Sequence, residues 1–277
     1  MIPPQNAPQF RQNLARGIMF MCLAILIMPV MNAMAKSLTV EYPLAMVVWA
    51  RFTGHFVAMT AIFWPGRGLR LFKSAKPSIQ FARSAIMFAS NGCYIAALST
   101  VALATASAIM FTAPLIVTAL SAPFLGEKVG IRRWSAVFVG FAGALVIIRP
   151  GMDTPTFDAS GWGVTLLIFS AASFAIYQVL TRKLSNRDSA ETMIVYTALI
   201  AAVVMSCAMP FIIVTPIGWQ DWALFVSVGI FGGVTQYFVA KALEQAPASV
   251  VSPYLYGELM VAAMVGFAVF GEFPDTW

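Results

Sequence analysis

Three ionisable residues stand inside stretches of this sequence that are otherwise apolar: Arg51, His55 and Glu258. A charge in hydrocarbon costs roughly 2.5–3.5 kcal/mol on insertion scales, so it needs a partner or a water-filled space. Arg51 and His55 are four residues apart and share one face of a helix. We interpret them as a site in which Glu258 holds a proton or an ammonium group and Arg51 holds a carboxylate. The alternative is a structural ion pair, or an Arg51 side chain that reaches the membrane interface.

Neutral polar residues recur at matched positions in the two halves of the chain. Asn91 and Gln236 are 145 residues apart, and Asn32 and Gln178 are 146 apart. An amide inside a membrane either contacts a ligand or binds a neighbouring helix, which contributes about 1 kcal/mol or less, and both roles stay open. Tyrosines stand beside these amides, and a buried tyrosine hydroxyl needs a partner. The candidate substrate-binding residues are Asn91, Tyr94, Tyr177, Gln178, Gln236, Tyr237, Tyr254 and Glu258, and the candidate ion-pair or coupling residues are Arg51, His55 and Glu258.

The composition requires a membrane around these residues. The chain has 277 residues, of which 60% are hydrophobic and 10% are charged, whereas a soluble domain carries about 25% charged residues. Cys22, Cys93 and Cys207 all lie in apolar stretches, which favours buried thiols over disulfides or a metal site. The chain has one histidine and none of the common catalytic motifs, so we expect no catalytic residues, no enzyme activity, no metal and no cofactor.

Nine apolar stretches have about the length that a helix needs to cross 30 Å of hydrocarbon. They are 17–35, 43–64, 79–99, 104–125, 133–149, 162–181, 191–214, 222–243 and 247–270. Pro114 and Pro253 interrupt the fourth and the ninth, and proline removes a backbone hydrogen bond and kinks a helix. We therefore expect these two spans to be the bending elements, with Pro114 and Pro253 as hinges.

Basic residues set the orientation of the spans. With the N-terminus inside, 14 of the 17 Lys and Arg residues fall on the inner side; Lys36 and Arg149 fall outside, and Arg51 lies within a span. This bias predicts a cytoplasmic N-terminus in a multi-pass protein of the cell's inner (plasma) membrane. The net charge of +6 is then a topology signal, and a nucleic-acid partner is not expected.

An internal repeat divides the chain. The stretch from Asn91 through Ser107 to Gly126-Glu127 recurs, at an offset of 145, from Gln236 through Ser252 to Gly271-Glu272. Five spans per half is an odd number, so the second half enters the membrane from the opposite side. We predict an all-α integral membrane protein made of two inverted five-helix halves, residues 1–150 and 151–277, with a substrate site between them.

The motifs of the repeat resemble a known family. Ala106-Ser107, Pro114, Gly126-Glu127, Trp134, Val139-Gly140 and Arg149-Pro150-Gly151 stand in the first half, and Ala246-Pro247-Ala248-Ser249, Tyr254, Glu258 and Gly271-Glu272 stand in the second. The chain resembles the EamA-type, ten-helix branch of the drug/metabolite transporter superfamily over nearly its whole length. The resemblance implies ten helices, cytoplasmic termini and export or exchange of small metabolites such as amino acids. The sequence stops at Trp277, where the tenth helix is expected to begin.

These observations predict a secondary transporter that works by alternating access, most simply an exporter of amino acids or related amphipathic compounds. The expected partners are a small-molecule substrate, the lipid bilayer and protons as a coupling ion, in a monomer or homodimer. The alternatives are an uncoupled uniporter, or a carrier of nucleosides, carboxylates or cationic drugs. An intramembrane enzyme would need a catalytic constellation that the sequence lacks, and a purely structural subunit would not need polar residues matched across both halves.

Overall fold

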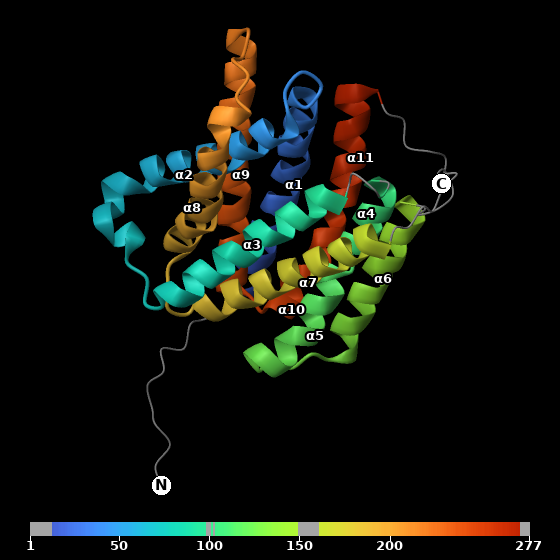
Figure 1. The fold of residues 1–277 in the computed structure, drawn as a ribbon. Helices are drawn as coiled ribbons and strands as arrows, with labels where there is room; N and C mark the ends of the chain where they lie inside the picture. The colour runs from blue at the N-terminus through green and yellow to red at the C-terminus, as the bar shows by residue number, and fades with distance from the viewer. Residues whose placement is uncertain (1–12, 98–100, 102, 149–160, 272–277) are drawn as a thin grey trace.

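The computed structural model describes residues 13–97, 101, 103–148 and 161–271, and this part of the chain is helical throughout, without strands. The helices are α1 Leu14–Leu38, α2 Leu44–Arg67, α3 Pro77–Ala97, α4 Leu103–Met110, α5 Ala113–Leu125, α6 Ile131–Ile148, α7 Gly161–Leu184, α8 Ala190–Ala208, α9 Trp219–Gln245, α10 Ala248–Val251 and α11 Gly257–Phe270, with 3-10 turns η1 Gly68–Phe72, η2 Met209–Phe211 and η3 Ser252–Tyr256 (Figure 1). The predicted all-α class is confirmed. Predicted features at Leu98, Arg149, residues 150–160, Glu272 and Trp277 lie outside the described residues.

The nine predicted stretches coincide with these helices. Seven of the described segments are long and apolar enough to cross a membrane, namely Leu14–Leu38, Leu44–Phe72, Ala106–Leu125, Trp162–Leu184, Ala190–Phe211, Trp219–Gln245 and Ala248–Val269. α3 and α6 are not among the seven. Polar residues such as Gln80 and Arg83 lower the hydropathy of α3. The chain is a multi-pass membrane protein.

The fourth and ninth predicted spans are broken helices. The fourth is divided into α4 and α5, with Pro114 in the first turn of α5, where a proline leaves no hydrogen bond unmade. The ninth is divided into α10, the 3-10 turn η3 and α11, with Pro253 in the first turn of η3. Both halves therefore contain a discontinuous helix at about the same place in the repeat.

The repeated glycines end helices in the same way. Gly126 follows α5 with φ 67° and ψ 20°, and Gly271 follows α11 with φ 66° and ψ 15°. This left-handed conformation is costly for any residue with a Cβ atom and is the usual C-terminal cap of a helix. The first Gly-Glu motif thus places Glu127 just beyond the end of α5.

The packing of the helices follows the repeat. α1 packs against α9 as α7 packs against α3, and α2 packs against α9 as α8 packs against α3. α1 meets α11 as α7 meets α5, while α2 and α8 pack on each other across the centre. Figure 1 shows α3 and α7 lying side by side. In each half, therefore, the first two helices pack against the third helix of the other half.

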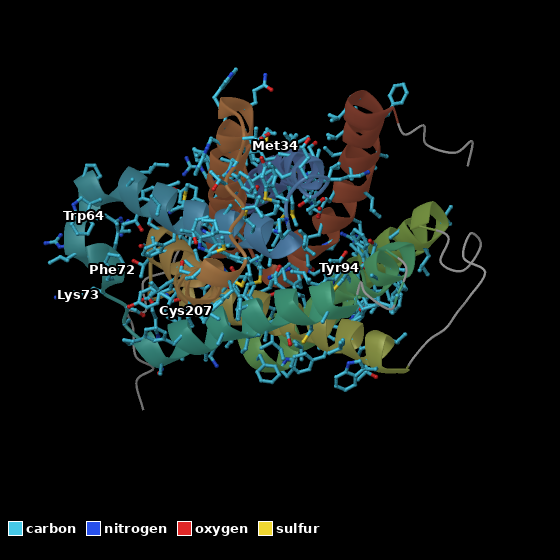
Figure 2. All side chains as sticks on the ribbon, turned by 45° about the horizontal axis from the view of Figure 1, so that its top comes forward. Met34, Trp64, Phe72, Lys73, Tyr94 and Cys207 are labelled. Carbon is cyan, nitrogen blue, oxygen red and sulfur yellow. The ribbon has the colours of Figure 1, made fainter. Side chains whose placement is uncertain are left out.

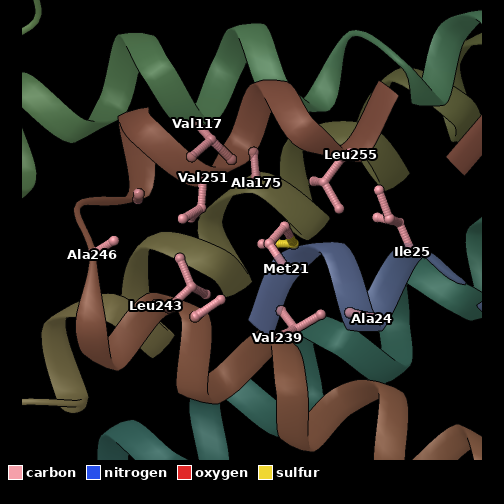
Figure 3. Close-up of a cluster of buried hydrophobic side chains, with 12 residues drawn as sticks. Met21, Ala24, Ile25, Val117, Ala175, Val239, Leu243, Ala246, Val251 and Leu255 are labelled. Carbon is pink, nitrogen blue, oxygen red and sulfur yellow. The ribbon is translucent and has the colours of Figure 1, made fainter. Parts of the chain in front are cut away.

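The largest described core cluster joins the two halves. Met21 and Ile25 of α1 meet Val239 and Leu243 of α9 and Leu255 of η3, with Val117 and Ala175 nearby (Figure 3). Small residues allow a close crossing between α2 and α9. A Cβ atom added at Gly229 would lie 2.5 Å from the Cα atom of Gly54, so neither position has room for a side chain.

Candidate functional site

Arg51 and His55 share one face of α2, as their spacing predicts, and this face is turned to two glycines of α9. A Cβ atom at Gly232 would lie 3.4 Å from Arg51 Cγ, and one at Gly233 would lie 3.1 Å from His55 Cδ2. His55 is 2% exposed. The paired glycines let a guanidinium and an imidazole fit between α2 and α9, where bulkier residues would exclude them.

Glu258 is brought near Arg51 and Tyr94 by three different helices. It lies in the first turn of α11, directly after the break in that span, where the helix dipole favours an acidic side chain. Glu258 interacts electrostatically with Arg51 of α2 and with Tyr94 of α3. Tyr94 of α3 (Figure 2) packs against a small buried cluster that contains Ala97 of α3 and Ala106 of α4.

Arg51 and Glu258 do not form an ion pair. The side-chain ion pairs within 4.0 Å between two described residues include Arg67–Glu191, Arg182–Glu127, Lys241–Glu191 and Lys241–Glu244. The pairing of Arg51 with Glu258 is absent from them. Arg51 and Glu258 therefore interact electrostatically inside the membrane region without a direct ion pair.

Two of the candidate side chains, His55 and Gln178, have buried polar atoms without partners among the described residues. His55 Nε2 has no hydrogen-bond partner in the described part of the chain, and neither has the amide nitrogen or oxygen of Gln178, whose side chain is fully buried. An unsatisfied buried polar group costs about 1–3 kcal/mol. Such groups are expected where a ligand or water completes the hydrogen bonding.

The remaining candidate residues occupy several environments. Tyr177 donates to Gln236 Oε1 at 3.4 Å, which joins α7 to α9. Asn91 donates to the carbonyl of Met87 in its own helix, at 2.9 Å. Tyr254 is 38% exposed.

The matched amides thus differ in their surroundings. Asn32 is exposed although its counterpart Gln178 is buried, and Asn91 bonds its own helix although its counterpart Gln236 bonds α7.

One candidate, Tyr237, contacts a different region, which we call the basic end: the helix ends and turns at residues 67–83, 126–133, 181–192 and 241–249. Its hydroxyl is 3.5 Å from Glu191 Oε1, and Lys241 lies over its ring. Glu191 is also 3.1 Å from Arg67 and 3.4 Å from Lys241, and Lys241 is 3.0 Å from Glu244. Every charge in this group has an opposite partner.

Glu127 joins the two halves at the basic end. Its carboxylate accepts hydrogen bonds from the amides of Ala248 and Ser249 at 2.9 and 3.1 Å, so it caps α10 of the other half. It also accepts from Ser249 Oγ at 2.6 Å and lies 3.7 Å from Arg182 Nε. Arg133 donates to the same Ser249 hydroxyl at 2.6 Å. The first Gly-Glu motif of the repeat thus holds the broken helix of the other half in place.

A fully buried arginine, Arg83, was missed as a functional residue at the level of sequence. It donates to Gln80 Oε1 at 3.0 Å, to Thr181 Oγ1 at 3.0 Å and to the carbonyl of Met193, and its guanidinium lies 5.1 Å from the centre of the Tyr177 ring. Asp188 in turn accepts from Gln80 Nε2 at 2.8 Å and from the turn before α3. Its signal in the sequence is an arginine within the apolar stretch 79–99, where the charge bias assigns it only to the inner side.

At the opposite end of the bundle, Tyr42 in the turn between α1 and α2 is hydrogen-bonded to residues at the start of α9 and just before it. Its hydroxyl donates to Asp221 Oδ2 at 2.6 Å and accepts from the amide of Ile217 at 3.2 Å. The hydrogen bond to the Asp221 carboxylate holds the pKa of Tyr42 above its ordinary value. Among the described residues no group of three or more His, Cys, Asp and Glu side chains is placed to hold a metal ion.

The motifs, the broken helices and the paired packing agree with one family model, that of the EamA-like transporter family, which matches residues 15–149 and 161–277. The chain belongs to this family. It is a transporter and not an enzyme, and it moves a small molecule.

Curated relatives in this family carry several substrates in both directions. The S-adenosylmethionine uptake transporter of Rickettsia felis is 27% identical over 260 residues, which cover 94% of this chain and 86% of that one. A riboflavin transporter of Vibrio cholerae is 37% identical over 169 residues, 60% of this chain and 54% of that one. A pseudopaline exporter of Pseudomonas aeruginosa is 26% identical over 265 residues, 95% of this chain and 90% of that one.

A solved crystal structure also shares the architecture. It superposes with a TM-score of 0.82 at 19% sequence identity and covers 95% of this chain and 91% of its own. At this identity the likeness establishes the fold alone.

Proposed function

We propose that this chain is a secondary transporter whose substrate is a small zwitterion, an amino acid or a related amphipathic compound, bound between Arg51 and Glu258. The observation that carries the proposal is that these two opposite charges, one from each half, lie near each other without pairing. A substrate carboxylate binds Arg51 and its ammonium group binds Glu258. Tyr94, His55 and Gln178 supply hydrogen bonds.

Transport proceeds by alternating access between two arrangements of the halves. Broken helices at corresponding places are a common feature of inverted-repeat carriers, because the break supplies both a binding site and a flexible joint. The contact of Glu127 with α10 closes the basic end in one arrangement and is released in the other. The substrate is then exposed to only one side at a time.

The membrane is the cell's inner membrane, with the N-terminus and the basic end in the cytoplasm, in accord with the distribution of Lys and Arg. Net transport is export, and Glu258 couples it to protons because its carboxylate can take up a proton when the ammonium group leaves. The pseudopaline exporter among the relatives supports the direction, and the resemblance to the drug/metabolite transporter superfamily, which implies small metabolites such as amino acids, supports the substrate class.

Flux of radiolabelled amino acids into proteoliposomes, with and without an imposed pH gradient, tests the proposal. Saturable flux that responds to the gradient is expected, and Glu258→Gln should lower it by about 100-fold or more, with loss of the gradient response. Arg51→Gln should raise the substrate concentration for half-maximal flux at least tenfold. Glu41→Gln and Arg70→Gln remove exposed charges of the same types and serve as controls.

Two results would contradict this reading. Flux of an amino acid that survives both interior substitutions would remove Arg51 and Glu258 from the site. Saturable but gradient-independent flux, unchanged by Glu258→Gln, would make the chain an uncoupled uniporter.

The role of the breaks is tested separately by Pro114→Ala combined with Pro253→Ala. More regular helices should slow the exchange between the two arrangements and reduce turnover about tenfold, with little change in substrate affinity. Turnover equal to that of the unaltered chain would show that these prolines are not hinges.

A further inference from the structure

A cavity of about 560 Å³ opens at the basic end, outside the region between Arg51 and Glu258. Its polar lining consists of Glu127, Lys128, Arg133, Arg182, Lys183 and Asn186. These residues come from the ends of α5 and α7 and the beginning of α6, so the cavity is built by elements of both halves. Four cations against one carboxylate make it strongly positive.

The single carboxylate in the cavity is already occupied. Glu127 accepts three hydrogen bonds from Ala248 and Ser249 and lies beside Arg182. Lys128 and Lys183, by contrast, are exposed and make no hydrogen bond or ion pair with any described residue. Among the described residues, the positive charges of Lys128 and Lys183 are therefore not balanced by a carboxylate, which makes the cavity suited to an anion from outside the chain.

The depth of the cavity indicates the kind of anion. It lies where the apolar spans ending at Leu125 and Leu184 give way to polar residues, which is the level of lipid headgroups. Phe124 and Leu125 form its apolar edge, and Phe124 is 59% exposed. Basic pockets between helix ends on the cytoplasmic side are suited to phosphate headgroups.

We propose that this cavity is a binding site for a phosphate group, with Lys128 and Lys183 as its principal ligands and Arg133, Arg182 and Asn186 as further donors. The phosphate is that of an anionic phospholipid headgroup or free phosphate. The lipid fits the apolar edge, because its acyl chains lie along Phe124 while its headgroup enters the cavity. The occupied site adds a counter-charge beside the Glu127 contact with α10.

Binding to the purified full chain tests the site. Short-chain phosphatidylglycerol, short-chain phosphatidylcholine and inorganic phosphate are titrated separately, and the dissociation constants are obtained from shifts of the thermal midpoint. The test variant is Lys128→Gln with Lys183→Gln. The control is Lys73→Gln with Lys76→Gln, which removes the same charge from exposed lysines at the same end but outside the cavity.

Phosphatidylglycerol should bind more tightly than phosphatidylcholine, and the test variant should weaken it roughly 30-fold, since each basic residue near a phosphate surface contributes about a factor of five. The control should lose less than about threefold. The same pattern with inorganic phosphate alone would identify free phosphate as the source and still support the site. Equal losses in the two double variants, or no preference for either anion over phosphatidylcholine, would overturn it.

Discussion

Charged residues occur in this protein in two contrasting settings, the basic end and the membrane interior. At the basic end, Glu191 and Glu127 each have several cationic or amide partners, and the partners come from different helices. In the interior, Arg51 and Glu258 interact without forming an ion pair, and His55 Nε2 has no described partner.

The contrast separates two uses of charge. A partnered charge lowers the energy of one arrangement of the helices, so it holds the basic end together. A charge without an ion-pair partner inside a membrane raises the energy of every arrangement of the helices. Such a charge is expected at a place where a ligand binds and neutralises it. Substitutions of partnered charges at the basic end should therefore lower the stability of the fold. Substitutions of Arg51 or Glu258 should instead impair transport with little loss of stability.

The largest effect is expected from Arg83→Met, which retains a long side chain but removes every donor of the buried guanidinium. The acceptors on Gln80, Thr181 and Met193 would lose their partner, at a cost of about 3 kcal/mol or more. Thermal unfolding of purified protein would measure the loss. Arg132→Met, at an exposed position of the same end, provides the comparison, and equal midpoints for the two variants would refute a structural role for Arg83.

A smaller loss, of about 2 kcal/mol, is expected from Glu127→Gln, because the charge-assisted bonds to α10 become ordinary ones and one amide loses its acceptor. The substitution should also open the basic end. In a cysteine-free background, Cys placed at the fully buried Ala246 should react faster with a water-soluble maleimide. An unchanged labelling rate would show that Glu127 does not hold the basic end closed.

Glu258→Gln should change stability by no more than about 1 kcal/mol, and upward, because it replaces an unpaired carboxylate by a neutral group of the same shape. Transport should be lost all the same. Glu258→Gln is thus expected to abolish transport and retain stability, whereas Glu127→Gln is expected to lower stability. A marked fall in the thermal midpoint would mean that Glu258 has a structural partner after all.

The smallest effect is expected from Tyr42→Phe, which removes the hydrogen bond to Asp221 at the end opposite to the basic end. The raised pKa of Tyr42 means that the folded chain holds this proton more tightly than the unfolded chain. The stabilisation is complete below about pH 10 and declines as the pH rises through the higher folded value. The difference in thermal midpoint between the two proteins should shrink above pH 10; a constant difference would argue against this account.

Much of the fold was predictable because membrane helices are specified by local properties. Stretches such as 17–35 and 222–243 must be helical once they enter hydrocarbon, since only an intact ladder satisfies the backbone there. The shared face of Arg51 and His55 follows from the helical period alone. The surroundings of Asn91 and Gln236 did not follow from their matched positions, because the two halves are similar in fold but pack different side chains around each amide.

By itself, the sequence determined the membrane class, the places of the helices, the two broken spans, the repeat and the family, since each depends on hydrophobic length, proline position or spacing along one chain. Only the tertiary structure decided which charges are partnered. It buried Arg83 beneath α7 and α8, brought Glu127 onto α10 and left Arg51 and Glu258 unpaired. Those outcomes depend on contacts between residues about 100 to 200 positions apart, which a local pattern does not encode.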